Sequence, residues 1–487
     1  MFGKGSLFEL LSTARTHIGE DTLARWLLAP AALEIVRRRH EAVNELRPRL
    51  DLREELAVVA EEARTGVDPV SLAAWGEAPV LFTGGVLRAA TWALSVLGAL
   101  AALALIGFVG YQLGAVQIPE STAILLRDYF LIAIFVNAVF IYRIRQKMDV
   151  VVRAVDESAH ELQLLSEVLL RLECESFQSP LLAQLRASLD AQGDPPSKRI
   201  ARLNRLMELL DSRDHLALRV MEPFILWTPH LAFAVEHWRQ RSGAAVRRWL
   251  TATGEIEALC SLASHAYEHP DDPFPEFAAE GAWLQAEGIG HPLIPENRVV
   301  RNDVRIGGEL RVLVVSGSNM SGKSTLLRTL GINAVLAQAG APVRAKRLRI
   351  SPLAIGASIR ITDSLQSGVS RFYAEILRLR QILDATAGAL PVLFLIDEFL
   401  HGTNSHDRRI GAEALVRGLV ERGAIGLITT HDLALAEIAD ALGERAANVH
   451  FEDQLEDGKM RFDYALRPGI VRKSNAIELM RSVGLKI

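Results

Sequence analysis

Two long apolar runs interrupt a chain whose other hydrophobic positions recur at helical or strand spacing. The first, residues 89–109 (AATWALSVLGALAALALIGFV), has no charged residue over 21 positions, enough helix to cross about 30 Å of hydrocarbon. The second, residues 129–142, spans a bilayer only if residues 121–126 join it and Arg127–Asp128 lie near the headgroups. Both runs are internal, so neither is a cleaved signal peptide. The pattern predicts a transmembrane helical hairpin that attaches the protein to a membrane through residues 89–142.

A pair of buried core helices is the competing interpretation, and the length of the second run alone would favour it. The first run argues against it, because a helix of a water-soluble protein keeps a polar stripe and this one offers only Thr91, Ser95 and glycines. Glu120 is the one charged residue of the loop 110–121, whereas positively charged residues flank the hairpin. These residues are Arg88 before the first helix and Arg143, Arg145 and Lys147 after the second. By the positive-inside rule we expect a multi-pass protein of the inner (cytoplasmic) membrane with both ends in the cytoplasm.

The remaining apolar spacing divides the chain into helical and α/β parts. Apolar residues three and four positions apart predict helices in residues 1–85 and 148–285, on either side of the hairpin at 86–147. From about His291 the pattern changes to short apolar runs alternating with helices, which predicts an α/β domain over residues 286–487.

Three apolar runs of the C-terminal part predict strands of a mostly parallel sheet. They are 311–317 (RVLVVSG), 392–397 (VLFLID) and 424–430 (AIGLITT). Nearer the C-terminus, two strand-like runs on either side of Asp457–Gly458 predict a β-hairpin.

Composition narrows the class of protein. Hydrophobic residues are 49% of the chain and charged residues 23%, which excludes a chain that is disordered throughout. The net charge of −4 means that the chain as a whole has no positive potential that would attract nucleic acid. Two cysteines exclude a disulfide scaffold. A mean hydropathy of +0.18 is high for so charged a chain, and the apolar hairpin accounts for it.

A phosphate-binding motif follows the first predicted strand. Gly317 to Ser324 match G-x-x-x-x-G-K-[ST] between a strand and a helix, so the loop is predicted to bind ATP through its backbone N–H groups. Lys323 would meet the β- and γ-phosphates, and Ser324 would ligate Mg²⁺. The nucleotide-binding candidates are Gly317, Ser318, Asn319, Met320, Ser321, Gly322, Lys323, Ser324 and Thr325.

Acidic and imidazole side chains end the next two strands. Asp397 is a candidate for holding the magnesium-bound water, and Glu398 for polarising the attacking water. A solvated pair of strand-end carboxylates is the alternative. His431 is a candidate γ-phosphate sensor at the end of the following strand, although a lone strand-end histidine is more often structural.

Five segments in this order resemble the ATPase domain of the MutS mismatch-repair family, an ABC-type ATPase: GSNMSGKSTLLR, QAGAPVRA, DSLQSGVSRFYAE, LIDEFLHGTNSHD and ITTHD. The resemblance implies that Ser370 is the signature serine, which reaches the γ-phosphate in the partner's site. It also implies that Gly402–Asn404 communicates between the two sites. Gln338 is similar to the family's Q-loop residue, which would place it at the metal with Ser324 and Asp397. The C-terminal Tyr464, Gly469 and Ser474–Asn475 also match.

Weaker resemblance extends upstream to the family's helical core, through a pattern that includes Thr16, Gly19, Trp26–Leu27 and Arg39. The mismatch-reading domain is missing from the pattern, and the hairpin replaces much of the helices that would surround DNA. We therefore expect an all-α MutS-core-like region interrupted by a transmembrane hairpin, followed by an α/β P-loop domain. The expected function is hydrolysis of ATP with Mg²⁺ in a homodimer formed through the ATPase domain, associated with duplex or branched DNA. The alternative is an ATP-driven membrane-linked switch that acts on a protein partner without DNA.

Overall fold

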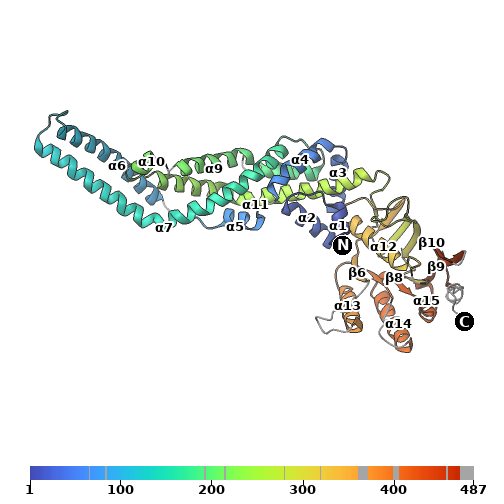
Figure 1. Cartoon of the computed structure of the whole chain (residues 1–487). Helices are drawn as coiled ribbons and strands as arrows, with labels where there is room; N and C mark the ends of the chain where they lie inside the picture. The colour runs from blue at the N-terminus through green and yellow to red at the C-terminus, as the bar shows by residue number, and fades with distance from the viewer. Residues whose placement is uncertain are drawn as a thin grey trace. The chain divides into compact units, whose positions relative to one another are not determined.

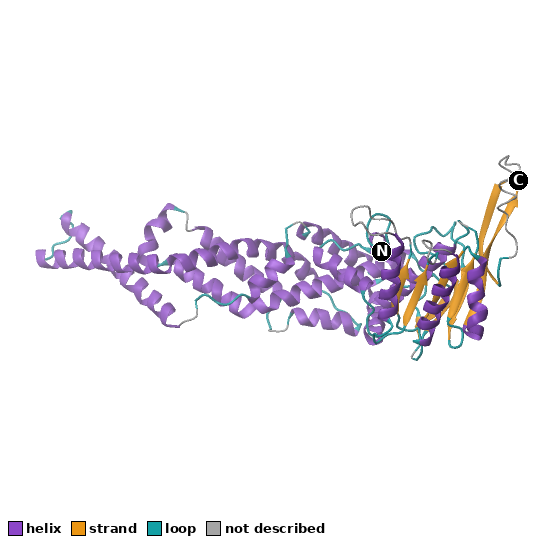
Figure 2. Ribbon diagram, turned by 90° about the horizontal axis from the view of Figure 1, so that it is seen from below, coloured by secondary structure: helices purple, strands orange, loops and turns teal. Residues whose placement is uncertain are grey.

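The computed structural model describes residues 1–64, 66–82, 85–190, 193–212, 215–278, 280–318, 320–359, 371–398, 405–456 and 459–471. The chain forms two compact units, each assembled from segments far apart in sequence. The sheet unit comprises Met1–Thr13, Thr22–Arg49 and Ala258–Ile487, and the helical unit comprises Ala14–Asp21 and Leu50–Glu257. All described strands belong to the sheet unit (Figure 2). The four consecutive segments expected from the sequence stay a prediction.

A six-stranded sheet forms the centre of the sheet unit. Its order is β10 (Lys459–Pro468), β9 (Ala446–Glu456), β4 (Val312–Ser316), β8 (Ile425–Thr430), β7 (Val392–Ile396) and β6 (Ala354–Ser358). The strands from β9 to β6 pair in parallel, and β10 pairs with β9 in the antiparallel sense. The predicted strands and the predicted β-hairpin are therefore confirmed.

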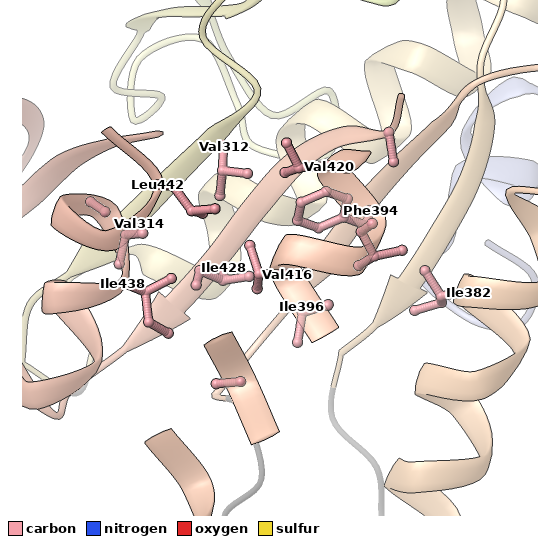
Figure 3. Close-up of a cluster of buried hydrophobic side chains, with 14 of the residues drawn as sticks. Val312, Val314, Ile382, Phe394, Ile396, Val416, Val420, Ile428, Ile438 and Leu442 are labelled. Carbon is pink, nitrogen blue, oxygen red and sulfur yellow. The ribbon is translucent and has the colours of Figure 1, made fainter. Parts of the chain in front are cut away.

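Helices pack on this sheet because its central strands are apolar on both faces. Every residue of β4, β7 and β8 is buried, as expected for strands covered on both sides. Val314, Phe394 and Ile428 lie in one core with residues of three helices, which Figure 3 shows. These helices are α13 (Arg371–Ala385), α14 (Ser405–Glu421) and α15 (Leu433–Leu442).

A second, four-stranded sheet, the N-terminal helices and two later helical segments complete the sheet unit. The sheet has the order β1 (Glu276–Phe277), β5 (Arg347–Ile350), β2 (Trp283–Ile289) and β3 (Asn302–Gly307). The helices are α1 (Leu7–Leu11), part of α2 (His17–Leu28), α3 (Leu33–Leu46), the end of α11 (Trp227–Glu268) and α12 (Lys323–Ala339). Buried Arg39 of α3 donates to the Ala339 carbonyl oxygen at 3.0 Å, and its guanidinium carbon lies 3.6 Å from the Trp26 ring centroid. Arg39 thereby satisfies a carbonyl at the C-terminus of α12.

The helical unit contains the two apolar runs. Its helices are α4 (Leu50–Ala63), α5 (Pro69–Glu77), α6 (Gly85–Gln112), α7 (Glu120–Glu173), α8 (Pro180–Leu189), α9 (Pro196–Asp211), α10 (Leu216–Ile225) and most of α11 (Trp227–Glu268) (Figure 1). The second apolar run continues without a break into the helical region expected from residue 148, as one helix, α7, of 54 residues.

Two helices of this unit, α6 and α7, are long and apolar enough to cross a membrane. In the most apolar 18-residue segment of each helix, only 17% of α6 and 11% of α7 is buried. The C-terminal half of α7 behaves differently, because Leu162, Leu165 and Leu169 are fully buried in the bundle. The apolar surface of the hairpin is thus left outside the protein core.

A buried ion pair on α11 fixes the chain where it leaves α5 for the hairpin. Arg239 and Glu236 pair at 2.8 Å, and their side chains are 6% and 4% exposed. Arg239 also donates to the carbonyl oxygens of Trp75, Ala78 and Pro79, and Glu236 accepts from the Leu81 N–H. The pair therefore adds hydrogen bonds to backbone groups at and just after the end of α5, where the regular helical bonds stop.

We expect Arg239→Met to lower the free energy of unfolding of the helical unit by about 3 kcal/mol, because it leaves Glu236 charged and buried. Arg247→Met is the matched control, since Arg247 pairs with Glu77 at an exposed position on the same helix and its loss should change the free energy of unfolding little. Chemical denaturation followed by circular dichroism measures both. Equal effects of the two substitutions would contradict the assigned role of Arg239.

Candidate nucleotide site

The candidate residues gather at the carboxyl edge of the six-stranded sheet. β8 lies between β4 and β7, so the loops after these three strands emerge side by side. Gly317 follows β4, Asp397 follows β7 and His431 follows β8. This edge is where parallel α/β sheets place ligands.

The loop after β4 curls because its glycines adopt backbone angles that side chains resist. Gly317 has φ 150° and Gly322 has φ 109°. A Cβ on Gly317 would come within 2.8 Å of Ser321 Oγ and 3.0 Å of the Phe451 carbonyl oxygen. Met320 at the tip also has a positive φ of 72°, and its side chain is exposed.

The ammonium group of Lys323 lies inside this loop. Lys323 is buried, and its Nζ donates to the carbonyl oxygens of Gly317 and Ser318 at 2.8 Å each. Burial lowers the pKa of Lys323, while the nearby charges of Glu398 and Asp397 act in the opposite direction. The positive charge is thus held where phosphate oxygens would be received.

Two buried hydroxyl groups in the loop show that it suits an anion. Ser318 Oγ and Ser321 Oγ have no hydrogen-bond partner among the described residues. Buried hydroxyls are normally satisfied, so unpaired ones beside an ammonium group and a helix N-terminus fit the oxygens of a phosphate chain. Ser324 and Thr325 lie in the first turn of α12, within this N-terminal end. These residues fit ATP.

The two carboxylates are positioned by one buried threonine of β8. Thr429 Oγ1 donates to Asp397 Oδ1 at 2.7 Å and accepts from the Glu398 N–H at 2.9 Å. Glu398 has φ 49°, a left-handed conformation that turns its side chain away from the strand direction. Its Oε1 lies 3.7 Å from His431 Nδ1. The Glu398 carboxylate and the His431 ring are therefore neighbours, and Thr429 holds Asp397 in the same part of the site.

The structure brings together most of the residues selected from the sequence. Lys323, Asp397, Glu398 and His431 meet at one edge, with Ser324 at the adjoining helix start. Candidates that lie outside the described residues are Asn319, Ser370, Gly402–Asn404 and Ser474–Asn475.

Gln338 requires a correction. It lies on the same helix as Ser324, fourteen positions later, which corresponds to about 21 Å of helix rise. It is buried, and its Oε1 accepts from the Leu353 N–H at 2.8 Å. Gln338 therefore cannot ligate the same Mg²⁺ as Ser324, and its role is to hold the chain before β6.

Tyr464 is a neighbour of the loop whose position could not be read from the sequence. It has φ 52° and sits at an irregularity of the β9–β10 register. A Cβ on Gly322 would lie 3.2 Å from its ring atom Cδ1. The side chain of Tyr464 thus closes one flank of the phosphate loop. The sequence signal was a Tyr in a matching C-terminal segment, with nothing to indicate which residue it would contact.

The strand–loop–helix geometry and the edge carboxylates define a P-loop nucleotide site, and comparison with known proteins shows which family this part of the chain is similar to. Residues 313–486 match the family model for MutS domain V. A DNA mismatch repair protein MutS 2 of Halobacterium salinarum is 34% identical over 246 residues, which are 50% of this chain and 27% of that protein. An endonuclease MutS2 of Thermus thermophilus is 35% identical over 204 residues, 40% of this chain and 25% of that protein.

These matches support membership of the MutS family and a P-loop ATPase α/β fold for the matched part of the sheet unit. The chain spans about a quarter of the length of these relatives. The activities, substrates and partners of these relatives as whole proteins are therefore proposals for this chain.

Two substitutions separate binding from hydrolysis. Lys323→Ala should weaken ATP binding by on the order of 100-fold, because it removes hydrogen bonds from a charged donor to the phosphates. Glu398→Gln should leave binding unchanged and slow turnover by about 100-fold or more, because its carboxylate is the candidate for polarising the attacking water. Equilibrium binding and phosphate-release assays measure the two effects.

The matched control for the second substitution is Glu437→Gln, which changes an exposed glutamate of α15 that pairs with Arg409. It should leave both binding and turnover unchanged. Normal hydrolysis by Glu398→Gln would remove Glu398 from the catalytic role.

Proposed function

We propose that this protein is a membrane-anchored ATPase of the MutS type that couples ATP binding and hydrolysis to a change in its helical unit. The observation that carries the ATPase proposal is the buried Lys323 ammonium beside unpaired Ser318 and Ser321 hydroxyls, facing Glu398 across one sheet edge. The match to MutS domain V supports it.

In the proposed reaction, Lys323 and the N-terminal end of α12 bind the phosphate chain and offset its charge. Ser324 and Asp397 would hold Mg²⁺, which supplies charge neutralisation at the β- and γ-phosphates. Glu398 orients the attacking water, and His431, 3.7 Å away, is placed to hydrogen-bond the γ-phosphate. Thr429 keeps both carboxylates in position.

The resemblance of SGVSRFYAE to the family signature leads us to propose a homodimer through the ATPase domain, in which Ser370 completes the partner's site.

Within the sheet unit, α12 begins at Lys323 and ends beside Arg39 of α3. A shift of α12 on nucleotide binding would therefore reach α3, and the chain continues from α3 into the helical unit.

The membrane anchor is proposed for the apolar surface of α6 and α7. The apolar segments of both helices are mostly unburied. By the positive-inside rule, the positive residues at both ends of the hairpin support a cytoplasmic position for those ends and for the ATP site. We propose the inner membrane as the location, with the loop 110–121 on its outer side.

DNA is the proposed partner because relatives of this chain carry the names DNA mismatch repair protein and endonuclease. The alternative is a protein partner, favoured by the replacement of DNA-surrounding helices with the hairpin and by a net charge of −4.

Titration of the detergent-purified protein with duplex, mismatched and branched DNA decides between these partners. The DNA proposal predicts binding whose logarithmic affinity falls linearly with the logarithm of the salt concentration, because phosphate contacts release counterions. Absence of binding to all three DNAs at low salt, in protein that still binds ATP, would contradict the DNA proposal and leave the protein-partner alternative.

A further inference from the structure

The short helix α10 packs against the apolar hairpin (Figure 1). Its Phe224 ring stacks on Phe130 of α7, with centroids 6.3 Å apart. The approach to α6 is so close that a Cβ on Gly98 would collide with the Phe224 carbonyl oxygen. Gly98 therefore lets the end of α10 sit directly on α6.

The polar side chains within the hairpin satisfy the end of α10. Asn137 of α7 donates from Nδ2 to the Pro223 carbonyl oxygen at 2.7 Å. Ser95 Oγ of α6 lies 2.9 Å from the Ile225 carbonyl oxygen, and its one hydrogen is shared between that oxygen and the Thr91 carbonyl oxygen, also at 2.9 Å. The last carbonyls of a helix have no helical partner, and leaving them unpaired in an apolar environment is costly. This gives a reason for a serine and an asparagine in two otherwise apolar runs.

The chain turns back immediately after this contact. Leu226 is buried with φ 50°, and α11 begins at the next residue. The Glu222 carboxylate accepts from the Thr228 N–H at 3.2 Å, so its charge is used to cap the first turn of α11. α10 and the start of α11 therefore form an elbow seated on α6 and α7.

The outer surface of α10 is apolar and exposed. Its sequence LALRVMEPFI has two charged residues, Arg219 and Glu222. Leu216 is 79% exposed and Val220 is 61% exposed. On α6, against which α10 packs, Trp92 and Val96 are also exposed apolar residues. Exposed apolar surface on two packed helices is typical of contact with a membrane or a partner.

The position of the elbow along α6 identifies lipid as the occupant. Ser95 lies seven residues after Arg88, about 10 Å further along the helix. If Arg88 marks the headgroup level, the end of α10 meets α6 at the depth of acyl chains. Arg219 can extend its charged end toward the headgroups from this depth.

We propose that α10 is a third membrane element: its Leu216 and Val220 contact acyl chains of the cytoplasmic leaflet, and its chain turns back at Leu226. This inference rests on the membrane hairpin proposed above.

Spin labels in proteoliposomes test it. Val220→Cys, Leu103→Cys and Val58→Cys are each made in the Cys174→Ser protein, since the other cysteine, Cys260, is buried. Leu103 is 64% exposed on the hairpin and Val58 is 72% exposed on α4, so they are the lipid and water references. The measured quantity is the ratio of collisions with dissolved oxygen to collisions with a water-soluble nickel chelate. We expect the ratio at Val220 to match Leu103 and to exceed Val58 several-fold.

Three other results would overturn the inference, each in a distinguishable way. A lipid-like ratio at Leu103 with a water-like ratio at Val220 refutes the role of α10 and keeps the hairpin. Low collision rates with both reagents at Val220 would mean that protein, such as a second copy of the chain, covers α10. A water-like ratio at Leu103 would refute the hairpin itself.

Discussion

Parallel pairing of β4, β8 and β7 is the constraint on which the candidate site depends. Ser316 pairs with Thr430, and Ile396 pairs with Ile428, so the three strands end within a few residues of one another at the same edge of the sheet. The phosphate loop, the two carboxylates and His431 follow these ends and must therefore meet. Full burial of the strands holds this register, because any slip would expose apolar residues or unpair backbone groups.

Satisfaction of buried backbone groups explains the polar residues found in apolar surroundings elsewhere. Arg39 donates to a carbonyl at the end of α12, and Arg239 donates to three carbonyls at and just after the end of α5. Ser95 and Asn137 of the apolar hairpin donate hydrogen bonds to carbonyl oxygens at the end of α10. In each case a helix terminus leaves carbonyls without partners, and a side chain from another helix supplies the donor.

Local patterns predicted the strands, the phosphate loop and the apolar helices because each depends on neighbouring residues. The prediction placed a boundary after residue 147, where the apolar run gives way to amphipathic spacing, but α7 continues because no helix-breaking residue lies there. Gln338 was assigned from its place in a motif, whereas the rise along α12 separates it from Ser324. The contacts of Tyr464 with the phosphate loop and of Ser95 with α10 join residues more than a hundred positions apart, and spacing alone cannot reveal them.

The most direct test asks whether one chain carries both an ATP site and a membrane anchor. The protein is reconstituted into liposomes, washed at high salt and alkaline pH, returned to neutral pH and floated on a density gradient, and ATP hydrolysis is measured in every fraction. The account predicts that protein and Mg²⁺-dependent hydrolysis float together with the lipid, and that Glu398→Gln protein floats without hydrolysing ATP. Release of the active protein into the dense soluble fraction, or undiminished hydrolysis by floated Glu398→Gln protein, would contradict it.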